Sequence, residues 1–247
     1  MKDYLFRCSS IGKLMTEAVS IDQKFRTPEV EAIIASKKRT DEEKALLEKL
    51  KRQTLSETAK TYIRELAAEA IFDVKFEVSS RPIEKGLLCE DKAIDLLNRV
   101  RGLDLIKNDD RRSNGFITGE CDLFDERRLV GHDIKCSWSL NTFPIVVKDC
   151  YDKDYEWQMR GYMALWNAEK WEVNYCLVDT PEDLIGWEPA SMHFVSSIPE
   201  HHRVTTWVVD RCPEKEALIW EKVAIAREYF IEILNEFDAT HPEPEVP

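Results

Sequence analysis

The sequence predicts an α/β fold in which a central mixed β-sheet is flanked by helices. From about residue 82 onward, the hydrophobic pattern switches repeatedly between helical and strand periodicity. Helices are expected at 83–100, 155–167 and 213–237, and strands near 104–107, 116–124, 129–136, 171–178 and 204–209. A helix, three strands, a helix and a further strand, in this order, are typical of a sheet covered by helices.

The N-terminal part of the chain is predicted to be helical and is more highly charged than the rest. Residues 28–75 are rich in Glu, Lys, Ala and Leu and are expected to form two or three helices, including 41–53 and 56–71. We interpret this block as a helical insertion within a single domain of residues 1–247, because a charge run on a helix is usually a solvated face. An acidic, proline-containing tail is expected at about 238–247.

Composition excludes several classes of protein. With 247 residues, 43% hydrophobic and 33% charged, the chain has the composition of a soluble globular protein. No apolar run approaches the ~18 residues needed to span a bilayer, so no membrane association is expected. The first ten residues lack the apolar core of a secretory signal. Seven cysteines without a CxxC pair favour reduced thiols in a cytoplasmic protein over a disulfide scaffold or a cysteine-held metal.

The net charge of −12 argues against nucleic-acid binding, because phosphate contacts require Lys and Arg. The distribution of charge can nevertheless outweigh its total. A carboxylate-lined metal site is acidic by necessity, and a local groove can still be basic. Charge alone therefore does not decide whether this protein binds nucleic acid.

The densest chemical signal comes from Asp122, Asp133 and Lys135. Residues two apart in a strand project from the same face, so Asp133 and Lys135 should point together. The turn-forming residues between 124 and 129 favour a hairpin that brings Asp122 beside them. Two carboxylates supply the oxygen ligands that Mg²⁺ or Mn²⁺ prefers, and such a metal polarises a phosphodiester and activates water. The competing interpretation is a surface salt bridge between a strand Asp and a strand Lys, which contributes little.

Two helical positions strengthen the hypothesis of a metal-dependent site. Glu90 is predicted to fall on the apolar face of its helix, near Leu87 and Leu97, where a carboxylate needs a partner. Gln158 is likewise expected among apolar neighbours, where its amide needs hydrogen bonds. The alternatives are a salt bridge from Glu90 to a nearby Lys or Arg, and a structural glutamine that ties helix to sheet.

Other side chains near these positions have two interpretations each. Lys107, Arg111 and Arg112 form a small basic patch that either holds phosphates or is simply solvated. Trp138 and Phe143 follow the 129–136 strand, and they either line a substrate-facing loop or belong to the core.

Five sequence motifs together resemble a known family. They are RCSSIGKLM at 7–15, KGLLCEDKAIDLL at 85–97, GECD at 119–122, DIK at 133–135 and WQMRGYMALW at 157–166. Their order and spacing are similar to those of the PD-(D/E)XK nuclease superfamily, and within it to the YqaJ-like viral recombination nucleases related to lambda exonuclease. The block at 27–75 and the C-terminal third match less distinctively.

The resemblance implies roles for individual residues. It implies that Glu90, Asp122 and Asp133 bind the metal, that Lys135 activates the attacking water, and that Gln158 is the motif glutamine. The sequence departs from the family pattern at Asp133, where many relatives carry Glu, and at the residue before Asp122, where others often carry Pro.

Three further residues are candidates for contacting substrate phosphate by the same resemblance: Ser10, Arg7 and Tyr162. Ser10 could equally be a plain helix cap. Glu120 lies two residues from Asp122 and competes with it as a ligand; Asp122 is preferred because it fits the motif order.

The resemblance implies a restriction-endonuclease-like core and a Mg²⁺-dependent exonuclease. Such an enzyme degrades linear double-stranded DNA from its ends, 5′-to-3′, in viral homologous recombination. It also implies a ring-shaped homotrimer, a single-strand annealing recombinase as partner, and a location in the host cytoplasm. An endonuclease of the same fold, which would cut closed circular DNA, and a non-catalytic DNA-binding module, which would not bind metal, are the alternatives.

Overall fold

The computed structural model describes residues 4–76 and 78–242, so the predicted acidic tail lies largely outside the described residues. A four-stranded sheet has the order β4-β5-β6-β7. Strand β5 (Val130–Cys136) pairs antiparallel with β4 (Leu123–Asp125) and parallel with β6 (Lys170–Cys176). Strand β7 (Val204–Asp210) completes the sheet antiparallel to β6. The predicted central mixed sheet is therefore confirmed.

A smaller sheet of order β1-β3-β2 lies beside the N-terminal segment. Its strands are β1 (Phe6–Arg7), β2 (Arg111–Ser113) and β3 (Ile117–Glu120). The single strand predicted at 116–124 is wrong, because the chain leaves one sheet after Glu120 and enters the other at Leu123. The two residues between these strands include Asp122, which therefore lies at the junction of the two sheets.

The strand predicted at 104–107 is also wrong. The segment makes one isolated bridge, from Lys107 to Leu123, and is otherwise irregular. Leu105 packs against the core, whereas Ile106 is 82% exposed, so the segment buries too little apolar surface to hold a paired strand.

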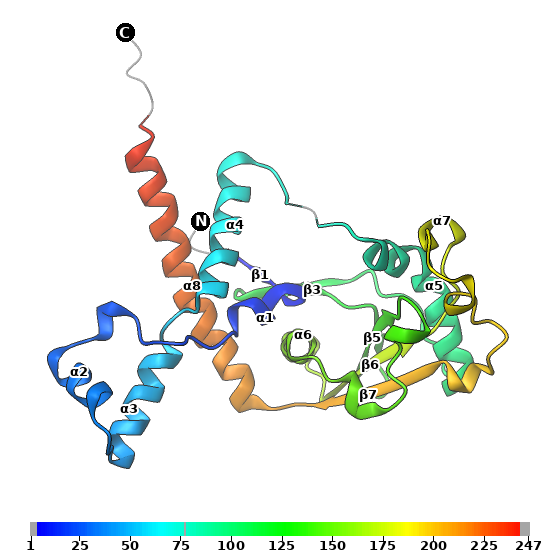
Figure 1. The fold of residues 1–247 in the computed structure, drawn as a ribbon, viewed down its shortest axis with the longest axis horizontal. Helices are drawn as coiled ribbons and strands as arrows, with labels where there is room; N and C mark the ends of the chain where they lie inside the picture. The colour runs from blue at the N-terminus through cyan, green and yellow to red at the C-terminus, as the bar shows by residue number, and fades with distance from the viewer. Residues whose placement is uncertain (1–3, 77, 243–247) are drawn as a thin grey trace, which may run out of the picture.

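Helices cover both faces of the four-stranded sheet (Figure 1). Helix α5 (Arg81–Arg101) lies on one side, begins with the Ser80 cap and ends at Gly102, whose φ of 62° suits a residue without a Cβ. It packs Leu97 and its neighbours against Ile134 of β5. Helix α6 (Lys153–Trp166) crosses over between the parallel strands β5 and β6 on the other side.

The larger core joins helices that are far apart in the sequence. It lies between α1 (Ile11–Leu14), α4 (Glu57–Phe72), α6 and the long helix α8 (Pro213–Thr240), and it encloses Trp171 of β6. Figure 1 shows α8 running beside α4. A short helix, α7 (Glu182–Ile185), lies near α5 on the opposite side of the molecule.

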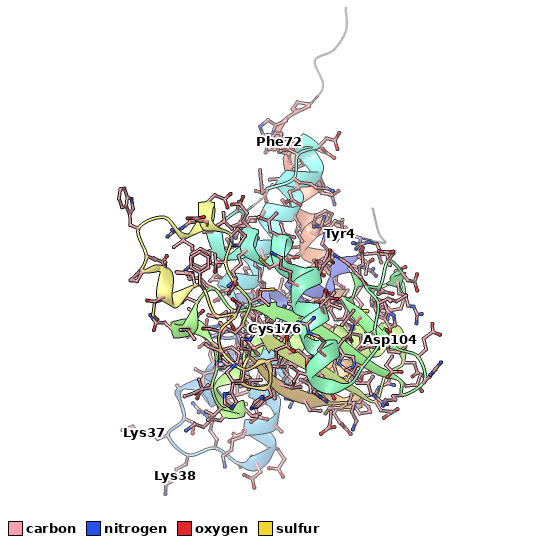
Figure 2. All side chains as sticks on the ribbon, turned by 90° about the vertical axis from the view of Figure 1, so that its right-hand side faces the viewer. Tyr4, Lys37, Lys38, Phe72, Asp104 and Cys176 are labelled. Carbon is pink, nitrogen blue, oxygen red and sulfur yellow. The ribbon has the colours of Figure 1, made fainter. Side chains whose placement is uncertain are left out.

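The N-terminal helical block divides into two structurally different parts. Helices α2 (Pro28–Ala35) and α3 (Asp41–Arg52) form a projecting hairpin with Lys37 and Lys38 at its tip (Figure 2). Helix α3 buries no residue, as expected of a solvated charged face. Helix α4 does not fit that expectation, because its Ile63 and neighbouring residues are part of the larger core.

All seven cysteines carry free thiols. Within the described ranges, no helix combines the length and apolar character required to cross a membrane.

A tight contact between β5 and β6 leads to a test of this packing. A Cβ placed on Gly131 would lie 2.2 Å from the ring of Trp171, which is fully buried. We expect Gly131→Ala to lower the free energy of unfolding by about 1–3 kcal/mol through overpacking, measured by urea denaturation followed by circular dichroism. The control is Gly86→Ala in α5, where the new Cβ would have no described atom within 4 Å apart from its chain neighbours and the backbone of its own helix. That variant should be about 0.5–1 kcal/mol more stable than wild type, from helix propensity. Wild-type stability of Gly131→Ala would contradict the described position of the Trp171 ring.

Candidate active site

A cleft of about 680 Å³ opens where α5, β5 and α6 meet. Its lining includes the acids Glu90, Asp122 and Asp133 together with Lys135 and Gln158. The structure therefore brings together all five residues predicted for the catalytic and metal-binding roles. The alternation of side chains along β5 accounts for part of this, because Ile134 faces the core under α5 whereas Asp133 and Lys135 face α6.

Asp122 is held by the strand that carries the other two residues. Its Oδ2 accepts a hydrogen bond of 2.6 Å from the backbone N–H of Ile134. Enclosure by protein raises the pKa of Asp122, and the neighbouring Asp133 carboxylate raises it further, to about 7. The Ile134 amide and the Lys135 ammonium offset part of this rise. Two carboxylates thus lie close enough to repel each other.

Asp133 is 2% exposed and contacts both a cation and an amide. Its Oδ2 lies 2.8 Å from the Lys135 Nζ, and its Oδ1 accepts a long hydrogen bond of 3.4 Å from the Gln158 Nε2. The first contact pairs a buried carboxylate with a cation, because an unpaired charge is costly to bury. The second joins strand β5 to helix α6.

Lys135 stays protonated in these surroundings. Burial by itself lowers the pKa of its ammonium, but the Asp133 carboxylate and Tyr155 raise it more strongly, and the net pKa is above its ordinary value. The ammonium also lies over the Tyr155 ring, 4.2 Å from the ring centroid. Lys135 can therefore act as a positioned cation or a hydrogen-bond donor, but not as a base.

Helix α6 adds a short chain of hydrogen bonds. The Gln158 Nε2 donates to the Tyr162 hydroxyl at 3.2 Å, and that hydroxyl donates to the Glu120 carbonyl oxygen at 3.0 Å. Burial raises the pKa of Tyr162, followed by the effect of Asp133, so the phenol remains protonated. The chain links Asp133 to the end of β3, just before Asp122.

Glu90 differs from its predicted environment. Its side chain is 20% exposed and forms an ion pair of 2.7 Å with Lys107, which was the alternative interpretation of this residue. The helical-wheel argument placed Leu87 on the buried face, but Leu87 is 74% exposed. The buried face of α5 is instead centred on Cys89 and Ala93, so Glu90 lies at its margin and opens on the cleft.

Comparison with solved structures identifies the family. A phage-related exonuclease from Haemophilus somnus 129PT shares 30% sequence identity with this chain, with a TM-score of 0.79. The match covers 95% of this chain and 97% of that protein. The chain belongs to the phage-related exonuclease family. The predicted resemblance to PD-(D/E)XK viral recombination nucleases is thereby confirmed.

Two further solved structures share the fold of this chain at lower sequence identity. The alkaline exonuclease LHK-Exo from Laribacter hongkongensis has a TM-score of 0.59 and 12% identity, over 96% of this chain and 92% of that protein. Its complex with dAMP has a TM-score of 0.57 and 13% identity, over 97% and 94% of the two chains. No family model and no curated protein matches the sequence.

The acids of this exonuclease-family cleft fit a hard divalent cation in chemistry, although they are not arranged as a finished cage. Among residues 4–76 and 78–242, no three His, Cys, Asp or Glu side chains are grouped so that they could hold a metal. Asp122 and Asp133 do lie together, and their mutual repulsion is what a cation between them would relieve. Glu90 faces the same cleft but is engaged with Lys107. The metal role of the three acids remains a prediction.

The candidate phosphate-contacting residues lie in different places. Tyr162 lines the cleft. Ser10 precedes α1 without a side-chain cap, and its hydroxyl lies near Tyr62, where it partly offsets the burial that raises the pKa of Tyr62 to about 12. Its neighbour Ser9 lines the cleft instead. Arg7 is exposed on β1 and does not line the cleft.

The predicted basic patch is neutralised by acids. Arg111 forms an ion pair with Glu120 at 2.7 Å, and Arg112 with Asp110 at 2.8 Å. Glu120 thus points toward solvent, away from Asp122, and does not line the cleft.

The sequence analysis missed two residues, one that lines the cleft and one that is buried against the chain directly after β5. Tyr155 precedes Gln158 by one helical turn, so the same face of α6 that predicted Gln158 could have revealed it. Lys85 is fully buried, and its Nζ donates to the backbone oxygens of Ser137 and Trp138, directly after β5. Nothing local marks Lys85, because lysine is rarely buried and its partners are distant in sequence.

The raised pKa of Asp122 leads to a test of stability against pH. The folded protein retains a proton on this carboxyl up to about pH 7, whereas the unfolded chain loses it near pH 4. Folding stability should therefore fall as pH rises between these values. In metal-free buffer we expect Asp122→Asn to be more stable than wild type by about 1–4 kcal/mol at pH 8, with little difference at pH 4.

The measurement is urea denaturation across pH in the presence of EDTA. Asp110→Asn is the control, because Asp110 lies on the surface, and it should change stability by less than about 0.5 kcal/mol. Parallel pH profiles for wild type and Asp122→Asn would show that neither burial nor the Asp133 carboxylate raises the pKa of Asp122.

Proposed function

We propose that this protein is a Mg²⁺-dependent deoxyribonuclease, with Mn²⁺ as an alternative metal, that degrades linear double-stranded DNA from its ends. The observation that carries the proposal is the enclosed cluster of Asp122, Asp133 and Lys135 in the cleft of a chain from an exonuclease family. The dAMP complex of LHK-Exo supports a substrate that contains nucleotides.

The residues of the cleft suit hydrolysis by water without a covalent intermediate. Asp122 and Asp133, joined by Glu90 once it is released from Lys107, would hold the metal. A bound Mg²⁺ supplies Lewis-acid polarisation of the phosphodiester and lowers the pKa of a coordinated water.

Lys135 carries a permanent positive charge, fixed by Asp133 and by the Tyr155 ring. Its proposed role is to orient the attacking water by donating a hydrogen bond and to stabilise the charge that develops on the phosphate oxygens. Gln158 keeps Asp133 in place from α6, and Tyr162 ties the same helix to the strand end before Asp122.

The proposal includes four properties that follow from the family resemblance. They are 5′-to-3′ polarity, a role in viral homologous recombination, a homotrimeric ring, and cooperation with a single-strand annealing recombinase. A ring is compatible with the net charge of −12, because only the surface that faces DNA need be basic. Activity in the host cytoplasm is compatible with seven free thiols.

The proposed catalytic role of Lys135 predicts a large loss of activity. We expect Lys135→Ala to degrade 5′-phosphorylated linear duplex DNA at least about 100-fold more slowly than wild type, because a preorganised charge at the reacting phosphate is lost. The measurement is release of acid-soluble nucleotides in Mg²⁺, with EDTA expected to abolish it. Lys44→Ala is the control, because Lys44 is an exposed residue of α3 that forms an ion pair with Asp41, far from the cleft residues in sequence.

The same assay separates the related possibilities. Closed circular DNA should stay intact, and a 5′ label should be released as mononucleotide before a 3′ label on the same strand. Cleavage of the circle would replace the exonuclease by an endonuclease of the same fold. Equal rates for wild type and Lys135→Ala would remove Lys135 from the mechanism, and DNA binding without hydrolysis in any divalent metal would leave a binding module.

A further inference from the structure

Trp138 occupies an unusual position just beyond the catalytic strand. It follows Lys135 by three residues and lines the same cleft as Asp122 and Asp133. It is only half-buried, and it is a member of none of the apolar clusters found among the described residues. Phe143, the other aromatic residue considered with it, is 8% exposed and is part of the core. Trp138 is therefore not explained by core packing.

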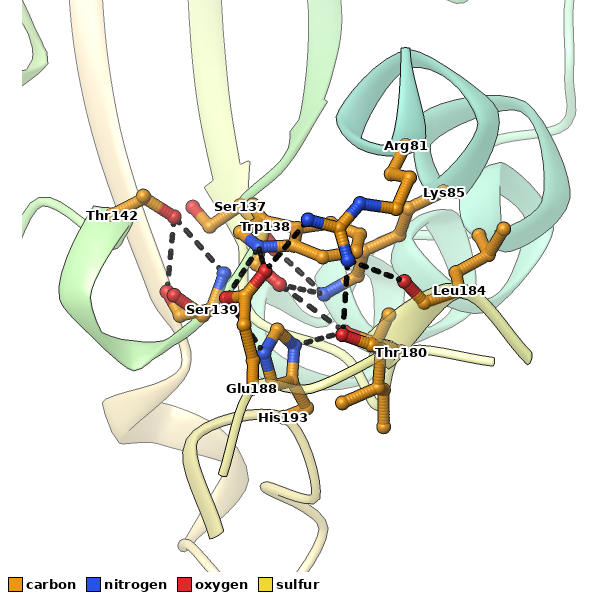
Figure 3. A network of polar contacts seen from close by, with 11 residues as sticks. Arg81, Lys85, Ser137, Trp138, Ser139, Thr142, Thr180, Leu184, Glu188 and His193 are labelled. Atoms are coloured by element: carbon orange, nitrogen blue, oxygen red, sulfur yellow. Dashed lines mark hydrogen bonds and ion pairs between the residues drawn. The ribbon is translucent and has the colours of Figure 1, made fainter. Parts of the chain in front are cut away.

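The indole ring of Trp138 is held by three side chains (Figure 3). The Arg81 guanidinium lies over the ring, 5.4 Å from its centroid. The Glu188 carboxylate accepts hydrogen bonds of 3.0 and 3.2 Å from the indole Nε1. His193 meets the ring edge-on at a centroid distance of 5.0 Å. We call Arg81, Glu188 and His193 the indole socket.

The socket residues are bound to one another and to the fold. Arg81 forms an ion pair of 3.2 Å with Glu188 and donates to the carbonyl oxygens of Leu184 and Ile185, at the end of α7. His193 is fully buried, and its Nε2 lies 3.2 Å from the Glu188 carboxylate. The segment between β6 and β7, which carries Glu188 and His193, thus contacts the first turn of α5, which carries Arg81, and the Trp138 indole lies between them.

The backbone of Trp138 is fixed as firmly as its ring. Its carbonyl oxygen accepts from the Lys85 Nζ at 3.0 Å and from the Thr180 hydroxyl at 3.1 Å. The Thr180 hydroxyl also lies 3.1 Å from the His193 Nδ1, and the His193 Nε2 lies 3.2 Å from the Glu188 carboxylate, so the backbone and the ring of Trp138 belong to one polar network.

This arrangement restricts what Trp138 can offer to a ligand. Its single donor, the indole N–H, is already bonded to Glu188, so it cannot read a base edge or bind a phosphate. What the Trp138 ring can still offer to a ligand in the cleft is its π surface, and the indole socket keeps this ring from rotating. Such a surface binds nucleobases by stacking, without preference for sequence.

We propose that Trp138 is the stacking platform for a nucleobase near the DNA end in the cleft, and that the indole socket fixes its orientation. The inference rests on the proposed function and extends it to the bases of the substrate. Stacking this close to Lys135 would place the strand so that one phosphodiester meets the Asp122 and Asp133 carboxylates.

The test removes the base and the ring separately. Dissociation constants are measured by fluorescence anisotropy for labelled linear duplexes, with Ca²⁺ in place of Mg²⁺. One abasic tetrahydrofuran nucleotide replaces, in turn, each of the first three nucleotides from the end. For wild type, we expect one of these positions to weaken binding by about tenfold or more. For Trp138→Ala, binding of the intact duplex should be weaker and the abasic duplex should bind no worse than the intact one.

Matched variants separate stacking from folding. Trp187→Ala should keep the full abasic penalty, because Trp187 is completely exposed on the same segment between β6 and β7. Trp138→Phe should keep part of it, since a π surface remains. If circular dichroism shows that Trp138→Ala does not fold, Trp138→Leu replaces it, and Glu188→Gln, which weakens the hold on Nε1, should reduce the penalty.

Several outcomes would overturn the inference. An equal abasic penalty in wild type and in Trp138→Ala, or in Trp138→Leu and Glu188→Gln where they are needed, would show that another residue meets the base. A wild-type protein that degrades linear DNA but has no abasic penalty at any position would contradict the inference and leave the proposed function intact. A wild-type protein that neither binds nor degrades DNA would contradict both the stacking inference and the proposed function.

Discussion

The site depends on the close approach of two carboxylates, Asp122 and Asp133, in surroundings with little water. Burial raises the pKa of Asp122, and the like charge of the Asp133 carboxylate raises it further. Strand β5 offsets part of this rise with two groups of its own, the Ile134 N–H and the Lys135 ammonium. Strand β5 therefore carries one of the two carboxylates and also the two groups that offset part of their repulsion. Under the proposed function, a divalent cation bound between the two carboxylates would relieve the repulsion that remains.

The junction between the two sheets is the structural counterpart of this arrangement. Asp122 can reach the Ile134 amide because the chain leaves the small sheet after Glu120 and enters the large one at Leu123. Tyr162 secures the junction by donating to the last carbonyl oxygen before it. In a continuous strand, the backbone of Asp122 would pair with the neighbouring strands, and strict alternation would fix the face of the sheet to which its side chain points. Because the strand is interrupted, the Asp122 side chain is free to point toward the Ile134 amide.

Local pattern predicted much of this structure, and the failures share a physical cause. The alternation of 129–136 placed Asp133 and Lys135 on one face, and the long helices were found close to their observed bounds. The break within 116–124 was missed because both halves are apolar and strand-like, and only the partner strands distinguish them. Lys85 could not be found by local reasoning, because it contacts backbone oxygens 52 to 93 positions away. The sequence left two interpretations open for Trp138, and only the structure shows that it lines the cleft. The family resemblance supplied the roles that spacing alone left open.

Cations near the cleft form ion pairs with acidic residues, which bears on how the acidic composition is interpreted. Lys135 pairs with Asp133, Lys107 with Glu90, and Arg81 with Glu188. Each of these cations is thus paired with an acid of the protein. The net charge of the chain therefore does not describe the local charge that DNA would contact in the cleft. Under the proposed function, Glu90 can join a metal shell only by giving up Lys107, and that lysine would then face the cleft without a partner. Metal binding and phosphate binding would therefore favour each other, because one ion pair restrains both groups. A rigid aromatic platform beside them adds affinity that does not depend on charge.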